Sequence, residues 1–468
     1  MGFILTALYI AVTIISPEQF GPEWANYHAL TYLAGITFLF SMPTIISGTQ
    51  LRSSIQTFLM LGFILAIAFS RVANGWIGGA LVSWQIFLPS AAVFFFIVAN
   101  VTTIRRLEIL AKVVAASCLI VVVEALCGYY LGFRADTFVL HQNLSSPDNA
   151  LGQLSRLRGA GFLSDPNDFS QMLLIALPLV FIAWRKWRGT ANSLTMFVPA
   201  AVLLWAIFLT HSRGALLALA ILTLMIAQKR LGSIPSSLLI AALIAGMVAI
   251  NFTGGRGISV GDGADRLEAW ATGLEMFKKA PLFGVGFGAF TDFNEITAHN
   301  SFVLCLAELG LVGTTLWVAL LVTTTSSLNK IISLWRKRQL KPASAGNVER
   351  KEDSTFVNPA TDFSKSPEVD TIVTAGIDEP IEQQHEPNVP IQALHTMRLA
   401  LVGFMTTSWF LSRSYSTPMY LVLGLATAMI ALQRPAAKSC IRSRWLFFTL
   451  ATETVALFCI YGMVHLRN

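Results

Sequence analysis

Long apolar runs recur along almost the whole chain, and they limit the folds that are open to it. About a dozen of these runs reach the roughly 20 residues that an α-helix needs to cross a bilayer. Only 13% of the 468 residues are charged and 54% are hydrophobic, whereas soluble domains carry about 25% charged residues. The sequence therefore predicts an all-α polytopic membrane protein with about 12 to 13 transmembrane helices.

The apolar runs define the expected spans. They are 2–16, 28–47, 55–74, 80–100, 107–131, 168–184, 193–210, 213–228, 235–252, 300–327, 397–411, 416–433 and 446–463. The first run lacks the basic region and cleavage site of a signal peptide, so we expect it to be a span. This pattern divides the chain into N-terminal helices (1–131), a central core (132–327), a loop (328–396) and C-terminal helices (397–468).

Basic residues mark one side of the predicted bundle. If the spans alternate, one side receives the following clusters: Arg105 and Arg106; Arg185, Lys186 and Arg188; Lys229 and Arg230; Lys330, Arg336, Lys337, Arg338 and Lys341; Arg434, Lys438, Arg442 and Arg444. The positive-inside rule assigns that side to the cytoplasm and places the N-terminus there. The net charge of +7 then reflects topology, and we expect no nucleic-acid partner.

Three polar segments face away from the cytoplasm in this topology: 132–167, the junction at 210–213, and 253–299. The long loop at 342–395 lies on the cytoplasmic side. It is rich in Pro, Ser, Glu and Asp, with roughly ten acidic residues against about three basic ones, and such a composition is typical of disorder.

The first outward segment contains "RLRGAGFLSDPNDFS" at 156–170. Asp165 stands before Pro166, which is typical of a helix start, and Asn167 and Asp168 could cap the first turn. For Asp165 and Asn167, the sequence fits a capping role and a functional role equally well. Capping does not explain Arg156 and Arg158, which are two arginines beside glycines in an outer loop.

The second segment is "LTHSRGALLALA" at 209–220, where Ser212 is a candidate helix cap. Arg213 lies on the outer side, against the usual charge bias. It is either an interfacial arginine that reaches toward headgroups or a functional cation.

The third segment contains apolar residues at helical spacing, and these predict an amphipathic helix at 264–279 that lies along the outer surface. Arg266 falls in the expected first turn, where the helix dipole disfavours a cation. The stretch "GVGFG" at 284–288 lacks the preceding strand of a nucleotide-binding motif, so we interpret it as a flexible turn.

Six basic side chains thus gather on the outer face: Arg156, Arg158, Arg213, Arg256, Arg266 and His299. Arginine binds phosphate oxygens through two parallel hydrogen bonds, and histidine exchanges protons near neutral pH. The set suits an anionic lipid headgroup such as a diphosphate. Few acidic residues cluster there, so we expect no bound metal.

Three stretches in this order resemble the O-antigen ligase/polymerase family of bacterial envelope glycosyltransferases. They are "RGAGFLSDPNDFS", "THSRGALLALA", and "RLEAWATGLEMFKKAPLFGVGFGAFT" followed by "AHNSFVLCLAELGLVG", and they cover about 155–325. The resemblance implies a GT-C-like transferase of the bacterial inner membrane, which uses neither metal nor cofactor. Its donor would be a glycan on undecaprenyl diphosphate, and its acceptor a periplasmic sugar hydroxyl on lipid A–core or on a growing glycan.

The resemblance also implies roles for individual residues. Arg213 and Arg266 would bind the donor diphosphate, with Arg158 as a third cation. His299 would activate the acceptor hydroxyl or assist the departing diphosphate, and Asn300 lies beside it at the outer end of the tenth span.

Glu308 follows His299 by about 13 Å along an ideal helix and lies on the opposite face. We therefore expect it to form hydrogen bonds inside the bundle and to have a structural role.

A flippase for the same lipid-linked glycan is the main alternative, because it also needs outward cations and about a dozen spans. A flippase should carry its charges along a path at mid-membrane depth. The cations here gather at one end, while Glu124, Glu308 and Glu453 are the main buried candidates. This asymmetry favours an enzyme, but it does not distinguish a ligase from a polymerase. Polymerisation of O-antigen and of exopolysaccharide both stay open.

Overall fold

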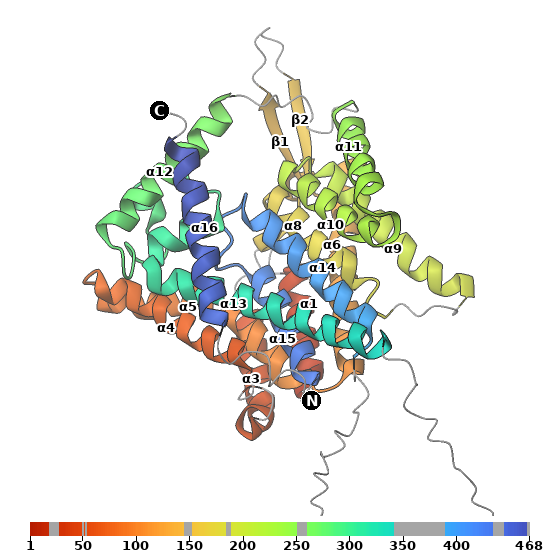
Figure 1. The fold of residues 1–468 in the computed structure, drawn as a ribbon, viewed down its shortest axis with the longest axis horizontal. Helices are drawn as coiled ribbons and strands as arrows, with labels where there is room; N and C mark the ends of the chain where they lie inside the picture. The colour runs from red at the N-terminus through yellow and green to blue at the C-terminus, as the bar shows by residue number, and fades with distance from the viewer. Residues whose placement is uncertain are drawn as a thin grey trace, which may run out of the picture.

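Helices make up nearly all of the structure and follow the apolar runs (Figure 1). The computed structural model describes residues 1–17, 28–48, 51, 54–144, 152–183, 189–249, 260–340, 389–433 and 444–465. Its longer helices are α1 (Gly2–Ile15), α3 (Ala29–Ser47), α4 (Ile55–Ala73), α5 (Ile77–Asn100), α6 (Ile104–Leu131), α8 (Pro166–Leu179), α9 (Gly189–Leu209), α10 (Arg213–Leu231), α11 (Ser233–Ala249), α12 (Val260–Lys279), α13 (Ser301–Leu340), α14 (Ile391–Ser408), α15 (Thr417–Leu432) and α16 (Trp445–His465).

Seven of the described helices are long and apolar enough to cross a membrane, namely α3, α4, α5, α6, α10, α13 and α16. Shorter apolar helices lie in α1, α9, α11 and α15. The predicted class, an all-α polytopic membrane protein, is confirmed.

Two helices run beyond their predicted spans into the loop expected at 328–396. Helix α13 continues to Leu340, and α14 already begins at Ile391. The disorder expected at 342–395 falls almost entirely on 341–388, which lies outside the described residues.

A β-hairpin in the first outer segment was not predicted. After the short helix α7 (Ala135–Phe138), strand β1 (Val139–Leu144) pairs antiparallel with β2 (Gly152–Leu157). In Figure 1 the hairpin projects from one end of the bundle, and the N-terminus lies at the opposite end. The hairpin carries Arg156 and Arg158 at its return to the bundle.

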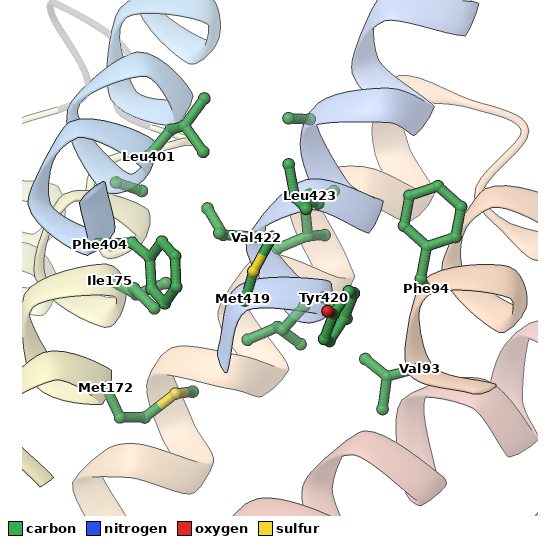
Figure 2. Packing of buried hydrophobic residues seen from close by; sticks show 14 of the residues in the cluster. Val93, Phe94, Met172, Ile175, Leu401, Phe404, Met419, Tyr420, Val422 and Leu423 are labelled. Carbon is green, nitrogen blue, oxygen red and sulfur yellow. The ribbon is translucent and has the colours of Figure 1, made fainter. Parts of the chain in front are cut away.

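Helix α15 forms the centre of the core (Figure 2). Its side chains from Pro418 to Ala431 are all buried, because α5 packs along one side and α8, α13 and α14 along the others. The ring of Tyr420 on α15 packs against that of Phe87 on α5, with ring centroids 5.0 Å apart. Peripheral helices instead expose large apolar side chains, such as Phe447 and Phe458 of α16, which suits contact with lipid.

Helix α13 is broken at Gly310, where φ is 60° and ψ is −161°. The chain at 281–286 packs into this break. The amide of Leu311 donates to the Pro281 carbonyl at 2.8 Å, and the amide of Gly286 donates to the Glu308 carbonyl at 3.0 Å. The break thus exchanges backbone hydrogen bonds with the loop, so that these polar groups inside the bundle remain paired.

The stretch "GVGFG" is a turn, as predicted, but it is packed against α13 and not flexible. Gly284 has a φ of 67°, and a Cβ there would collide with the backbone of Glu308. Only glycine fits such a close backbone approach at positive φ. The Glu308 side chain also holds this loop, because its Oε1 accepts a hydrogen bond from the Phe290 amide at 3.1 Å.

Candidate functional site

The candidate site is built around the start of α13, where His299 precedes the helix in a left-handed conformation with a φ of 47°. This conformation costs a residue other than glycine about 1–2 kcal/mol, so the surrounding structure must hold it. Asn300 is fully buried, and its Oδ1 accepts hydrogen bonds from the amides of Phe302 and Val303. Asn300 therefore caps α13 and fixes the backbone of the residue beside it.

Helix α12 holds the other side of His299. The indole nitrogen of Trp270 donates to the carbonyl of Ala298 at 2.8 Å, and Trp270 is buried. Gly273 allows α12 to approach α13 closely, because a Cβ there would lie 2.6 Å from Val303. The predicted amphipathic helix is present, and its apolar face packs on the bundle.

Helix α12 begins at Val260, about one turn earlier than predicted, so Arg266 lies in its second turn. The dipole argument for Arg266 is therefore wrong, because that effect is confined to the first turn. Arg266 is exposed and precedes Trp270 by one helical turn, which places it on the same side of α12 as the residue that holds Ala298.

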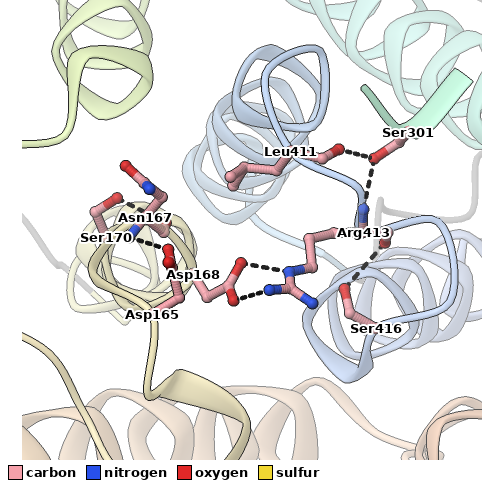
Figure 3. A network of polar contacts seen from close by, with 8 residues as sticks. All are labelled: Asp165, Asn167, Asp168, Ser170, Ser301, Leu411, Arg413 and Ser416. Atoms are coloured by element: carbon pink, nitrogen blue, oxygen red, sulfur yellow. Dashed lines mark hydrogen bonds and ion pairs between the residues drawn. The ribbon is translucent and has the colours of Figure 1, made fainter. Parts of the chain in front are cut away.

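The loop between α14 and α15 packs on the start of α13 (Figure 3). The Ser301 hydroxyl donates to the Leu411 carbonyl at 2.5 Å and accepts from the Arg413 amide at 2.9 Å. The Ser414 hydroxyl donates to the Ser301 carbonyl at 2.6 Å. These bonds fix the backbone of the loop within two residues of His299.

Arg413 extends from this loop and forms a bidentate ion pair with Asp168 in the first turn of α8 (Figure 3). The Asp168 side chain is 6% exposed, whereas that of Arg413 is 40% exposed. The predicted capping role of Asp168 is therefore wrong, since its carboxylate holds Arg413. Asp165 does cap α8, by accepting from the Asn167 amide at 2.7 Å.

The surroundings of His299 lower its pKa below the ordinary value of 6.5. Burial is the largest cause; Arg266 and Arg413 also lower this pKa, whereas Asp165 raises it. These three residues come from α12, the α14–α15 loop and the start of α8, so they converge on His299. A histidine with a lowered pKa is neutral at pH 7 and can accept a proton.

Arg213 lies at the start of α10, next to the same α14–α15 loop. Ser212 caps α10 through the amide of Ala215, and a Cβ on Gly214 would lie 3.5 Å from the Cβ of Phe410. Arg213 is half-buried there. The start of α10 therefore borders the loop that supplies Arg413.

The two arginines of the hairpin have structural contacts. Buried Arg156 donates through Nε to the Thr210 carbonyl at 2.9 Å and through a terminal nitrogen to Asn167 at 3.1 Å. Arg158 donates to the Asp136 carbonyl at 2.6 Å. The Asn167 side chain therefore accepts a hydrogen bond from Arg156 and does not cap α8. Arg256 lies outside the described residues.

Sequence reasoning missed Arg413, which adds a cation to the site. The sequence does single out Arg413, because the predicted spans 397–411 and 416–433 leave this basic residue on the outer side of the membrane. This is the same departure from the positive-inside pattern that singled out Arg213.

Among the described residues, no group of three or more His, Cys, Asp or Glu side chains could hold a metal ion.

Comparison with known proteins gives one family. The sequence model of the O-antigen ligase family (Wzy_C) matches residues 198–318. This segment contains α10, α12, Arg213, Arg266 and His299, and the match confirms the predicted resemblance. The first of the three stretches, at 158–170, lies outside the matched segment. No curated protein matches the chain.

Proposed function

From the match of residues 198–318 to the O-antigen ligase family, we propose that the protein transfers a glycan from undecaprenyl diphosphate to a sugar hydroxyl. The reaction takes place at the periplasmic face of the bacterial inner membrane. The observation that carries this proposal is that α12, which carries Arg266, and the α14–α15 loop, which carries Arg413, are both hydrogen-bonded to the chain beside the half-buried His299. This site lies at one end of a bundle of membrane helices.

His299 is the general base in this proposal. Its lowered pKa keeps the imidazole neutral at pH 7, so the ring takes the proton of the acceptor hydroxyl as that oxygen attacks the anomeric carbon. The bond between this carbon and the diphosphate oxygen breaks, and the electron pair leaves with the diphosphate. A single displacement of this kind inverts the anomeric configuration.

Arginines bind the leaving diphosphate. Arg213 and Arg266 supply the charge that the family resemblance implies, and Arg413 adds a third guanidinium. Guanidinium groups bind phosphate oxygens in pairs and stabilise the charge that develops on the leaving group. Arg158 was the predicted third cation, but its bond to the Asp136 carbonyl supports a role in holding the hairpin.

Two acceptors agree with this chemistry, namely lipid A–core for a ligase and a lipid-linked glycan for a polymerase. The test uses purified protein with an undecaprenyl-diphosphate-linked glycan, EDTA and no nucleotide, and supplies the acceptors one at a time. Products are resolved by mass. Transfer to lipid A–core identifies a ligase, and growth of the lipid-linked chain identifies a polymerase.

The same preparation tests the main alternative. If neither acceptor is modified while the lipid-linked glycan crosses the bilayer of proteoliposomes, the protein is a flippase and the proposal is wrong. Transfer that stops with EDTA and returns with a divalent cation would contradict the metal-independent mechanism.

A further inference from the structure

A second cationic cluster lies at the other end of the bundle. Helix α10 begins at Arg213 beside the candidate site, and Lys229 lies about 24 Å further along it at 1.5 Å per residue. The Lys229 Nζ is 3.2 Å from Nδ1 of His395 on α14. Arg398, one turn further along α14, donates to Oδ1 of Asn329 on α13 at 3.4 Å.

Within the part of the chain that the structure describes, the charges that act on this cluster are all positive. Those that act on His395 belong to Lys229, Arg398 and Arg336, and those that act on Lys229 belong to Arg398 and Arg336. The cluster joins three helices that are far apart in the sequence. Its cations, Lys229, Arg336 and Arg398, repel one another, and the repulsion is stronger where a side chain is half-buried, as Arg398 is. A bound anion would relieve this repulsion.

We propose that the cluster of Lys229, Arg336, His395 and Arg398 binds the phosphate of an anionic phospholipid in the leaflet opposite to the His299 site. The two guanidinium groups pair with phosphate oxygens. Lys229 donates to Nδ1 of His395, which leaves the Nε2–H of the neutral ring to donate to the same phosphate.

The surroundings of the cluster favour a lipid over free phosphate. Ile226 and Leu231 of α10 are 51% and 54% exposed, so apolar surface for acyl chains lies beside the basic groups. Basic pockets between the cytoplasmic ends of membrane helices are known to bind anionic headgroups. The proposal does not depend on the transferase activity.

The first test measures thermal unfolding of the purified full-length protein with added phosphatidylglycerol, phosphatidylcholine or inorganic phosphate. We expect phosphatidylglycerol to raise the Tm most. An equal rise with phosphatidylcholine would overturn the proposal. An equal rise with inorganic phosphate would overturn the assignment to a lipid and leave a site for the free anion.

The second test measures lipid retention by native mass spectrometry. The double substitution Arg336→Gln and Arg398→Gln should weaken retention of phosphatidylglycerol roughly tenfold. The control, Arg230→Gln with Lys330→Gln, removes the same charge from α10 and α13 and should retain the lipid. Equal retention by the two variants contradicts the proposal. If the first variant does not fold, competition between the two lipids on the unchanged protein decides the matter.

Discussion

Two helix starts in this protein have the same local design and different surroundings. Helix α10 begins with His211, Ser212 and Arg213, and α13 begins with His299, Asn300 and Ser301. Both histidines have a left-handed backbone, with φ values of 49° and 47°, and both precede a side chain that caps the helix. The local sequence therefore does not distinguish them.

The tertiary contacts of the two histidines do distinguish them. His299 is flanked by Trp270, which holds the preceding carbonyl, and its pKa is lowered by burial, Arg266 and Arg413. The ring of His211 packs against Phe208, with ring centres 6.0 Å apart. A helix start thus becomes a candidate catalytic site through the segments that converge on it. Three substitutions and a pH profile test this comparison.

The largest expected effect is that of His299→Ala. Loss of a general base should reduce transfer by roughly 100-fold to 10,000-fold, whereas His211→Ala should reduce it by no more than about threefold. Mass-resolved product formation per folded protein measures both. Similar losses for the two variants would contradict the distinction between the helix starts.

Arg413→Gln should have the next largest effect. Removal of a charged hydrogen-bonding group costs about 1.5–3 kcal/mol, so transfer should fall by roughly 10-fold to 100-fold and undecaprenyl diphosphate should inhibit more weakly. Arg413→Lys should restore little, because a single ammonium cannot keep two parallel bonds to Asp168 and also offer directed donors to the diphosphate.

Arg105→Gln is the control for this change, since Arg105 lies in the first turn of α6, on the cytoplasmic side of the expected topology. Unchanged inhibition by undecaprenyl diphosphate in Arg413→Gln would show that this arginine does not bind the leaving group.

Trp270→Phe should have a smaller effect. The ring stays, but the hydrogen bond to the Ala298 carbonyl is lost, and a neutral bond contributes about 1 kcal/mol. We expect kcat to fall about fivefold with little change in KM. Trp205→Phe makes the same substitution at an exposed indole that donates to the Tyr130 hydroxyl at 3.2 Å, and it should leave kcat unchanged. An equal decrease in both variants would indicate a general loss of stability.

The sequence predicted the helices well because transmembrane length and hydrophobicity are local properties. The cap at Asp165 and the amphipathic helix before Lys279 were also predicted, since each depends on a few neighbouring residues. The hairpin at 139–157 was missed, because a short pairing of polar strands leaves little periodicity to detect.

The candidate site was predicted less completely. Arg413 lies more than 100 residues from His299, and its pairing with Asp168 depends on how α8 packs with α14. The broken helix at Gly310 was also missed, because its hydrogen bonds are made with the loop at 281–286. Nothing in the local sequence specifies these contacts.

The pH dependence of transfer tests most directly whether the surroundings make His299 a base. Transfer should be constant near pH 7 and fall as the pH drops through the lowered pKa of His299, because protonation removes the base. Arg266 lowers this pKa and Asp165 raises it. In normalised profiles, Arg266→Gln should therefore move the acid limb to higher pH, and Asp165→Asn, which keeps a capping side chain, should move it to lower pH. Limbs that do not move, or that move in the same direction, would contradict this account.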